Sequence, residues 1–128
     1  MCHEASGSAL SETLGIGKGS TTLDDLYKAE LVMVIGQNPA TNHPRMLSAL
    51  EKCKNNGGKI IAINPLPEAG LMNFTDPQNP LKMLTGGTKI SDVFVPITIN
   101  GDVAFMKAIL LKLLEKEEAE GLVFDNDF

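Results

Sequence analysis

A short apolar run that ends in a glycine and a polar loop is the feature that most constrains the fold of this chain. Residues 31–35 read Leu-Val-Met-Val-Ile, and Gly36 and a loop rich in amides follow them. Such a run is typical of a buried strand. We expect Asn42 to be the N-cap of the next helix, with Pro44 in its first turn. The segment therefore predicts a strand–loop–helix unit of an α/β sheet.

The loop of this unit offers groups that suit a ligand. In an open α/β sheet, ligands bind in the crevice outside the carboxyl ends of the strands. Gly36 lets a ligand approach the backbone closely, and a helix start offers free N–H groups to an anion. The neutral hydrogen-bonding side chains of the loop are Asn38, Thr41 and Asn42. The alternative is a strand-to-helix turn that binds nothing, because such turns serve many folds.

Strands and helices continue to alternate along the chain. Residues 44–55 have apolar side chains at helical spacing, and short apolar runs at 59–63 and 92–96 predict two further strands. A final helix with an apolar stripe begins near 100–102. Short links between successive strands require parallel pairing through right-handed crossovers. The sequence predicts one domain over residues 1–128, a small, doubly wound, mainly parallel α/β sheet flanked by helices (Rossmann-like).

Other segments are expected outside the sheet. Residues 1–30 predict an N-terminal helical segment, in which Thr22 and Asp25 have the spacing of a capping box. Residues 65–90 are rich in proline and glycine and predict a long irregular loop. Residues 119–128 predict a flexible tail.

Composition excludes several classes of function. The net charge of −5, with no basic stripe, argues against nucleic-acid binding, and one Tyr with no Trp leaves little for base stacking. No apolar run is long enough to insert into a membrane. The two cysteines lack CxxC spacing, so we expect a reducing, cytoplasmic location.

A glycine-rich stretch at 15–20 resembles a phosphate loop only superficially. It reads Gly-Ile-Gly-Lys-Gly-Ser, lacks the Lys-Ser or Lys-Thr ending, and does not follow a buried strand. It is therefore no Walker motif, although Lys18 remains a candidate for a place near a phosphate. No GxGxxG fingerprint of a nicotinamide-binding fold follows a strand either.

Three groups of residues together resemble the molybdopterin oxidoreductases, the large bis-pterin enzymes of molybdenum or tungsten. They are Gly36 to Pro44, Asn64-Pro65 after the second strand, and Cys2-His3. The likeness is closest to formate dehydrogenase alpha subunits and their uncharacterised relatives. It implies that the chain is an internal fragment of a larger subunit with an iron–sulfur cluster elsewhere. The implied partners are the remaining domains of that subunit and electron-transfer subunits.

The resemblance implies catalytic roles for two residues near the amino terminus. Cys2 matches the position of the cysteine or selenocysteine that binds the metal, and His3 matches a histidine proposed to shuttle protons. A thiolate suits a metal already held by sulfur, and an imidazole exchanges protons near neutral pH. From the residues alone, a buried thiol beside a surface histidine remains the alternative. We expect Cys53 to be part of a helix core.

The resemblance also implies contacts with the pterin guanine dinucleotide. Residues of the first loop match positions that contact its pyrophosphate and ribose: Gly36, Asn38, Thr41 and Asn42. The loop formed by Asn100, Gly101 and Asp102 matches one that closes on the guanosine end, although Asp102 would serve equally well as a helix cap. His43 is expected to support the helix start instead of touching the cofactor.

The second loop departs from the family pattern. Many members have Asp-Pro-Arg after the second strand, where the carboxylate binds guanine, whereas this chain has Asn64, Pro65 and Leu66. Asn64 can accept one hydrogen bond, and Glu68 would supply the carboxylate if the turn brings it back. The predicted function is thus to bind molybdopterin guanine dinucleotide within a molybdenum or tungsten oxidoreductase. The isolated chain is expected to have no catalytic activity. The alternative is a stand-alone, non-catalytic nucleotide-binding or regulatory module.

Overall fold

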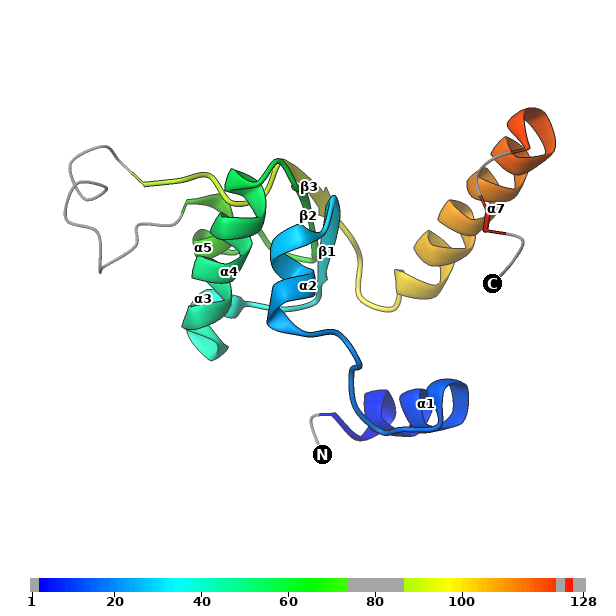
Figure 1. Cartoon of the computed structure of the whole chain (residues 1–128), viewed down its shortest axis with the longest axis horizontal. Helices are drawn as coiled ribbons and strands as arrows, with labels where there is room; N and C mark the ends of the chain where they lie inside the picture. The colour runs from blue at the N-terminus through cyan, green and yellow to red at the C-terminus, as the bar shows by residue number, and fades with distance from the viewer. Residues whose placement is uncertain (1–2, 74–86, 122–123, 126–128) are drawn as a thin grey trace.

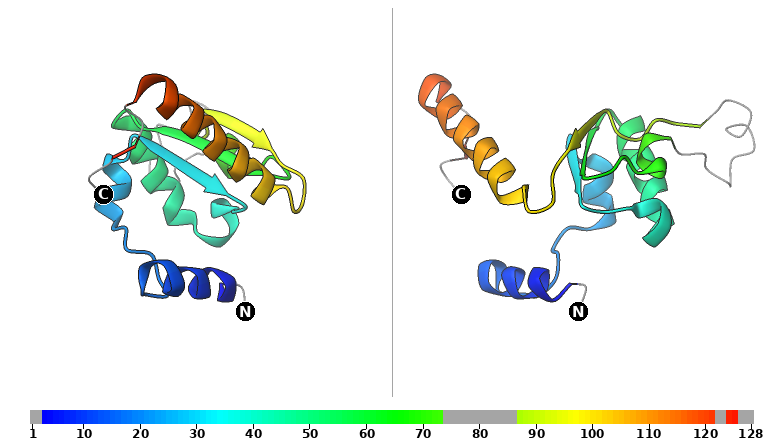
Figure 2. Two further views of the ribbon diagram at one scale, coloured as in Figure 1. Left: turned by 90° about the vertical axis from the view of Figure 1, so that its right-hand side faces the viewer. Right: turned by 180° about the vertical axis from the view of Figure 1, so that it is seen from behind.

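The centre of the computed structural model is a three-stranded parallel sheet. The structure describes residues 3–73, 87–121 and 124–125. The strands are β1 (Leu31–Ile35), β2 (Lys59–Asn64) and β3 (Val93–Pro96), in the order β1-β2-β3. Leu31 pairs with Lys59, and Asn64 pairs with Pro96. All three strands point the same way, so their carboxyl ends form one edge (Figure 2).

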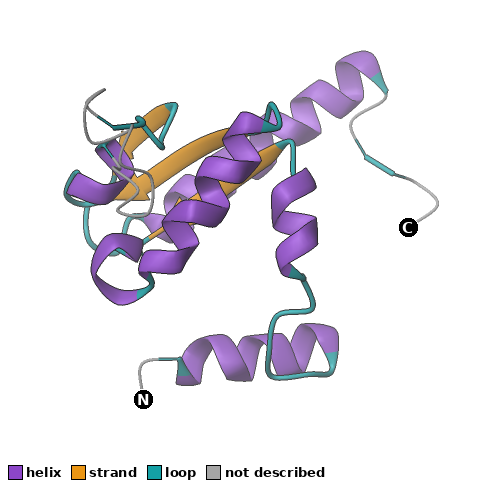
Figure 3. Cartoon of the chain, turned by 60° about the vertical axis from the view of Figure 1, so that its left-hand side comes forward, coloured by secondary structure: helices purple, strands orange, loops and turns teal. Residues whose placement is uncertain are grey.

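Helices cover one face of this sheet. The central one is α4 (Pro44–Asn55), which links β1 to β2, and α2 (Leu23–Lys28) packs beside it (Figure 3). Two four-residue helices, α3 (Pro39–Asn42) and α5 (Ala69–Met72), contact each other next to α4. The core cluster between the strands and these helices consists of Val34, Leu47, Leu50, Ile60, Ala62, Leu71 and Ile90.

The other face of the sheet is bare within the described part of the chain. Side chains alternate across a strand, so β1 buries Val34 on the helical side and exposes Leu31, Met33 and Ile35 on the other. The long C-terminal helix α7 (Asp102–Glu120) lies on this bare side but stands away from it (Figure 1), and no residue of α7 is buried. The N-terminal helix α1 (Glu4–Leu14) also lies apart from the sheet (Figure 1).

The predicted strands and the parallel α/β arrangement are confirmed. β1 has the predicted bounds, and the capping box of Thr22 and Asp25 is present at the start of α2. The second helical layer of a doubly wound sheet does not pack onto the described strands, because the β3–α7 link directs α7 outward (Figure 2). The apolar stripe of α7 is therefore in solvent instead of in the core.

One local prediction is wrong, and another concerns a segment that the structure describes only in part. Asn42 is not the N-cap of α4: it is the last residue of α3, and His43 is the N-cap of α4. The cause is an extra turn of helix, which Asn38 caps by accepting a hydrogen bond from the Thr41 N–H. The segment 65–90, predicted to be an irregular loop, contains the short helix α5. Its four residues are too few to show a helical pattern in the sequence.

Candidate functional site

The three loops that leave the carboxyl ends of the strands lie side by side. The Gly36 N–H donates to the Ile63 carbonyl at 2.9 Å, and the Ile97 N–H donates to the Asn64 carbonyl at 3.2 Å. These bonds continue the strand pairing by one residue on each side of β2. The starts of the β1 and β3 loops therefore lie on the two sides of the end of β2, at the edge of the sheet formed by the carboxyl ends of the strands.

Gly36 makes the backbone of the first loop accessible. Its φ is +67°, a left-handed conformation that glycine adopts without strain. Among the described residues other than its two chain neighbours, none has an atom within 4 Å of the position that a Cβ would take. The backbone N–H groups of Gln37 and Asn38 have no hydrogen-bond partner within the described part of the chain. A ligand oxygen could therefore reach these donors without displacing a side chain.

Asn38 joins the first loop to the start of α5. Its Oδ1 accepts from the Thr41 N–H at 3.3 Å, and its Nδ2 donates to Glu68 Oε2 at 2.6 Å. The turn after β2 thus brings Glu68 back to the first loop, which is the arrangement that the sequence analysis required for Glu68 to supply a carboxylate there. The carboxylate lies at the crevice, half-buried, 30 positions along the chain from Asn38.

Asn64 supports the first loop from below. The whole residue is 3% exposed, and its Nδ2 donates to the Gln37 carbonyl at 3.0 Å. Its amide is therefore committed to the protein, while Pro65 after it is exposed. The geometry gives Asn64 a supporting place under the crevice.

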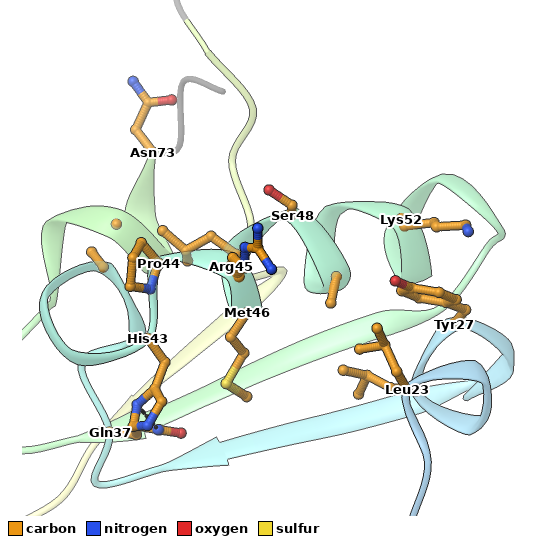
Figure 4. Close-up of a pocket in the computed structure, with 15 residues that line it drawn as sticks. Leu23, Tyr27, Gln37, His43, Pro44, Arg45, Met46, Ser48, Lys52 and Asn73 are labelled. Atoms are coloured by element: carbon orange, nitrogen blue, oxygen red, sulfur yellow. Dashed lines mark hydrogen bonds between the residues drawn. The ribbon is translucent and has the colours of Figure 1, made fainter. Parts of the chain in front are cut away.

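Gln37 was not singled out from the sequence, yet it connects both supports. Its carbonyl accepts from Asn64, and its Nε2 lies 3.1 Å from His43 Nδ1 (Figure 4). His43 thus contacts the first loop from the start of α4, as expected of a supporting residue. The available signal was the position of Gln37 between Gly36 and Asn38.

A broad hollow of about 1400 Å³ lies along α4, not over the crevice. Its walls come mainly from α2 and α4, and only Gln37, Ala40 and His43 connect it with the first loop (Figure 4). Lys52 lies 3.9 Å above the ring of Tyr27 at its far end. This cation–π contact stabilises the packing of α2 on α4.

The turn at 100–102 does not join the first loop. Asn100 has a φ of +68°, the Gly101 N–H donates to the Thr98 carbonyl at 2.9 Å, and Asp102 begins α7. No hydrogen bond between described residues connects this turn with residues 36–42. These residues direct α7 away from the sheet, and their predicted contact with guanosine stays a prediction.

Of the proposed catalytic residues Cys2 and His3, the structure describes only His3. Cys2 lies outside the described residues, and His3 is the exposed N-cap of α1 without a capping hydrogen bond. Among the residues that the structure describes, no three His, Cys, Asp or Glu side chains gather as a metal site would need. The assignment of Cys2 as a metal ligand therefore stays a prediction.

Cys53 is a core residue of α4. Its thiol is fully buried and donates to the Ala29 carbonyl at 3.3 Å. Burial raises the pKa of the Cys53 thiol, because the thiolate would lose its hydration. The thiol therefore serves packing, as predicted.

Comparison with known proteins shows to what this chain is similar. No family model matches the sequence. The chain is 54% identical over 129 residues to an uncharacterized oxidoreductase of Mycobacterium tuberculosis, an alignment that covers 100% of the chain and 17% of the relative. Protein YdeP of Escherichia coli K12 is 46% identical over 120 residues, which cover 93% of the chain and 16% of that protein.

Formate dehydrogenases are more distant relatives. The alpha subunit of Megalodesulfovibrio gigas is 27% identical over 117 residues, which cover 91% of the chain and 10% of the subunit. The α/β fold and these similarities define an oxidoreductase-related segment. In particular, the predicted resemblance to formate dehydrogenase alpha subunits and their uncharacterised relatives is confirmed. The chain spans about one sixth of the length of its more similar relatives.

Within the described ranges, no helix is both long enough and apolar enough to cross a membrane.

Proposed function

We propose that this chain is the segment of a molybdopterin-dependent oxidoreductase that holds the guanine dinucleotide part of the cofactor. The observation that carries the proposal is Gly36, with its left-handed φ and the open space beside it where the first loop lies next to the end of β2. Similarity to oxidoreductases, including formate dehydrogenase alpha subunits, supports this assignment. The metal, molybdenum or tungsten, and the redox chemistry come with the cofactor when it is bound.

The residues at the crevice suit a nucleotide. The N–H groups of Gln37 and Asn38 would hold pyrophosphate oxygens, and Thr41 and Asn42 in α3 offer exposed polar side chains to a ribose. The first loop and α3 therefore offer groups for both the pyrophosphate and the ribose of a nucleotide.

Binding by the isolated chain is expected to be weak and its turnover absent. The crevice is open, and the proposed metal ligand Cys2 is assigned by resemblance alone. We further propose that the remaining domains of a longer subunit cover the ligand and pass electrons to partner subunits. Reduction of nitrate or oxidation of formate by this 128-residue chain would contradict the proposal.

An amide-shift titration with GDP tests the proposal directly. Shifts at Gly36, Gln37 and Asn38 at millimolar GDP, with smaller shifts for inorganic phosphate, are the expected result. Amides of α7, which stands apart from the crevice, supply the internal control. Shifts confined to α7, or none at any of these positions, would overturn the assignment of the crevice.

A further inference from the structure

The first loop and α5 are held together by two independent contacts. One is the 2.6 Å hydrogen bond from Asn38 Nδ2 to Glu68 Oε2, immediately before α5. The other is the packing of α3 against α5, which lie next to each other beside α4 (Figure 1). Both contacts act on the loop that carries the candidate site.

The packing contact requires a glycine at position 70. A Cβ at Gly70 would lie 2.3 Å from the Cβ of Ala40 and 3.3 Å from Leu47 Cδ1. Real Cβ atoms do not approach a methyl group so closely, so any larger residue would push α5 away from α3. Gly70 is itself buried, which shows that the two short helices are in tight contact.

The hydrogen bond fixes the orientation of the Asn38 amide. Because Glu68 accepts from Nδ2, Asn38 Oδ1 is directed to the Thr41 N–H. Asn64 holds the same loop from the side of β2 through the Gln37 carbonyl. The loop is therefore held between the end of β2 and the start of α5.

We propose that Glu68 and Gly70 are positioning residues of the candidate site, which hold the Gly36–Asn38 backbone in the conformation that binds a nucleotide. The inference rests on the proposed function for its ligand, but the hydrogen bond between Asn38 and Glu68 can be measured without a ligand. Glu68 acts through Asn38 and does not contact the ligand.

The charge of Glu68 allows this role to be separated from direct binding. Glu68→Gln keeps an acceptor for Asn38 and removes a negative charge near the site of an anionic group. We therefore expect GDP to bind the Glu68→Gln chain as tightly as wild type or more tightly. Glu68→Ala removes the acceptor, and we expect roughly tenfold weaker binding, which is the effect of one lost hydrogen bond of ordinary strength.

A second pair of variants tests the packing contact. Gly70→Ala is expected to reduce GDP-induced shifts at Gly36 and Asn38. The double variant Ala40→Gly/Gly70→Ala moves the methyl group to the other side of the contact and should restore them. Ala40→Gly alone is the matched control and should bind as wild type does. A double variant no better than Gly70→Ala would overturn the role of this contact.

The experiment combines GDP titrations with the side-chain NH₂ signals of Asn38 in the full 128-residue chain. We expect these signals to be shifted and protected in wild type and Glu68→Gln, and to approach free-amide values in Glu68→Ala. Unchanged Asn38 signals in Glu68→Ala would show that Glu68 does not hold the Asn38 amide and would overturn the inference. If Glu68→Gln instead loses a preference for GDP over ADP, then Glu68 touches the base, and the positioning role is wrong.

Failure of the proposed function would look different. If wild type gives no shifts with GDP, the nucleotide site is wrong, and the Asn38 signals alone decide whether Glu68 braces the loop. A lower melting temperature of Glu68→Ala with unchanged GDP binding would show a merely structural role and overturn the inference.

Discussion

Lys54 and Asp92 form a polar clamp at the end of the sheet opposite to the candidate site. Lys54 Nζ lies 2.9 Å from Asp92 Oδ1, and the other carboxylate oxygen accepts from the Ile60 N–H at 2.9 Å. Lys54 also donates to the carbonyls of Lys89 and Ile90. One ion pair thus ties the end of α4 to β2 and to the approach to β3.

The first prediction concerns the stability of this clamp. Asp92→Ala leaves the Ile60 N–H without its acceptor and the Lys54 ammonium without its carboxylate partner, with only the Lys89 and Ile90 carbonyls remaining. We therefore expect a loss of about 2 kcal/mol in the free energy of unfolding. Urea denaturation at neutral pH measures it. Glu118→Gln, on the exposed surface of α7, is the control and should change the midpoint little.

The second prediction is a pH dependence. The hydrogen bond from Ile60, and next the one from Lys54, hold the pKa of Asp92 below its usual value. A depressed folded-state pKa means that this stabilisation is present above the unfolded-state pKa of about 3.9 and is lost as pH falls through the folded-state pKa. Wild type should therefore lose more stability than Asp92→Asn on acidification below about pH 4. Parallel acid dependence of the two chains would contradict this contribution.

The third prediction separates ligand access from backbone strain at Gly36. Gly36→Ala and Gly57→Ala both place a methyl group in open space at positive φ, so each should cost about 1 kcal/mol. Only Gly36 lies at the candidate site, so only Gly36→Ala should abolish the GDP-induced shifts. Equal GDP binding by the two variants would count against the assignment of the crevice.

The fourth prediction compares the two faces of β1. Val34 is 2% exposed on the helical side, whereas its neighbour Met33 is 45% exposed on the bare side. Val34→Ala should cost about 2 kcal/mol, because it leaves a cavity in the core, and Met33→Ala less than about 0.5 kcal/mol. Thermal melts of the two variants and of wild type measure both stability losses. Equal losses would mean that the outer face is also packed.

The fifth prediction concerns the approach of β2 to α4. A Cβ at Gly58 would lie 2.5 Å from Cys53 Sγ and 2.6 Å from the Ala29 carbonyl oxygen. Gly58→Ala should therefore cost about 1–3 kcal/mol. Adding Cys53→Ala removes the sulfur but not the carbonyl, so the double variant should recover only part of the loss beyond that of Cys53→Ala alone. Calorimetric melts of the three chains provide the comparison.

The sequence predicted the elements whose signals are local. The apolar run of β1 and the capping box of Thr22 and Asp25 each need only their neighbours in the chain. The four-residue helices α3 and α5 are too short to show a helical repeat, so Asn38 was recognised as polar but not as a cap. Tertiary contacts, not periodicity, define such short turns.

The candidate site could be placed from the sequence, but its internal bonding could not. A polar loop after each strand indicated the crevice. The bonds of Asn38 to Glu68 and of Asn64 to the Gln37 carbonyl depend on how two crossovers pack, which no spacing reveals. The exposure of α7 likewise depends on the direction of one turn at 97–101. An apolar stripe indicates that a face is suited to burial, not what it meets.

The bare face of the sheet makes the stability of this chain a quantity that depends on its surroundings. Leu31, Met33, Ile35 and Val93 expose apolar area that exists as one surface only while the strands are paired. Any molecule that covers this surface binds the folded state and not the unfolded one. By mass action it raises the unfolding free energy in proportion to the logarithm of its concentration above its dissociation constant. The melting temperature of the chain alone is thus a lower limit. The increase in melting temperature caused by a molecule bound to this surface reports the affinity of that molecule.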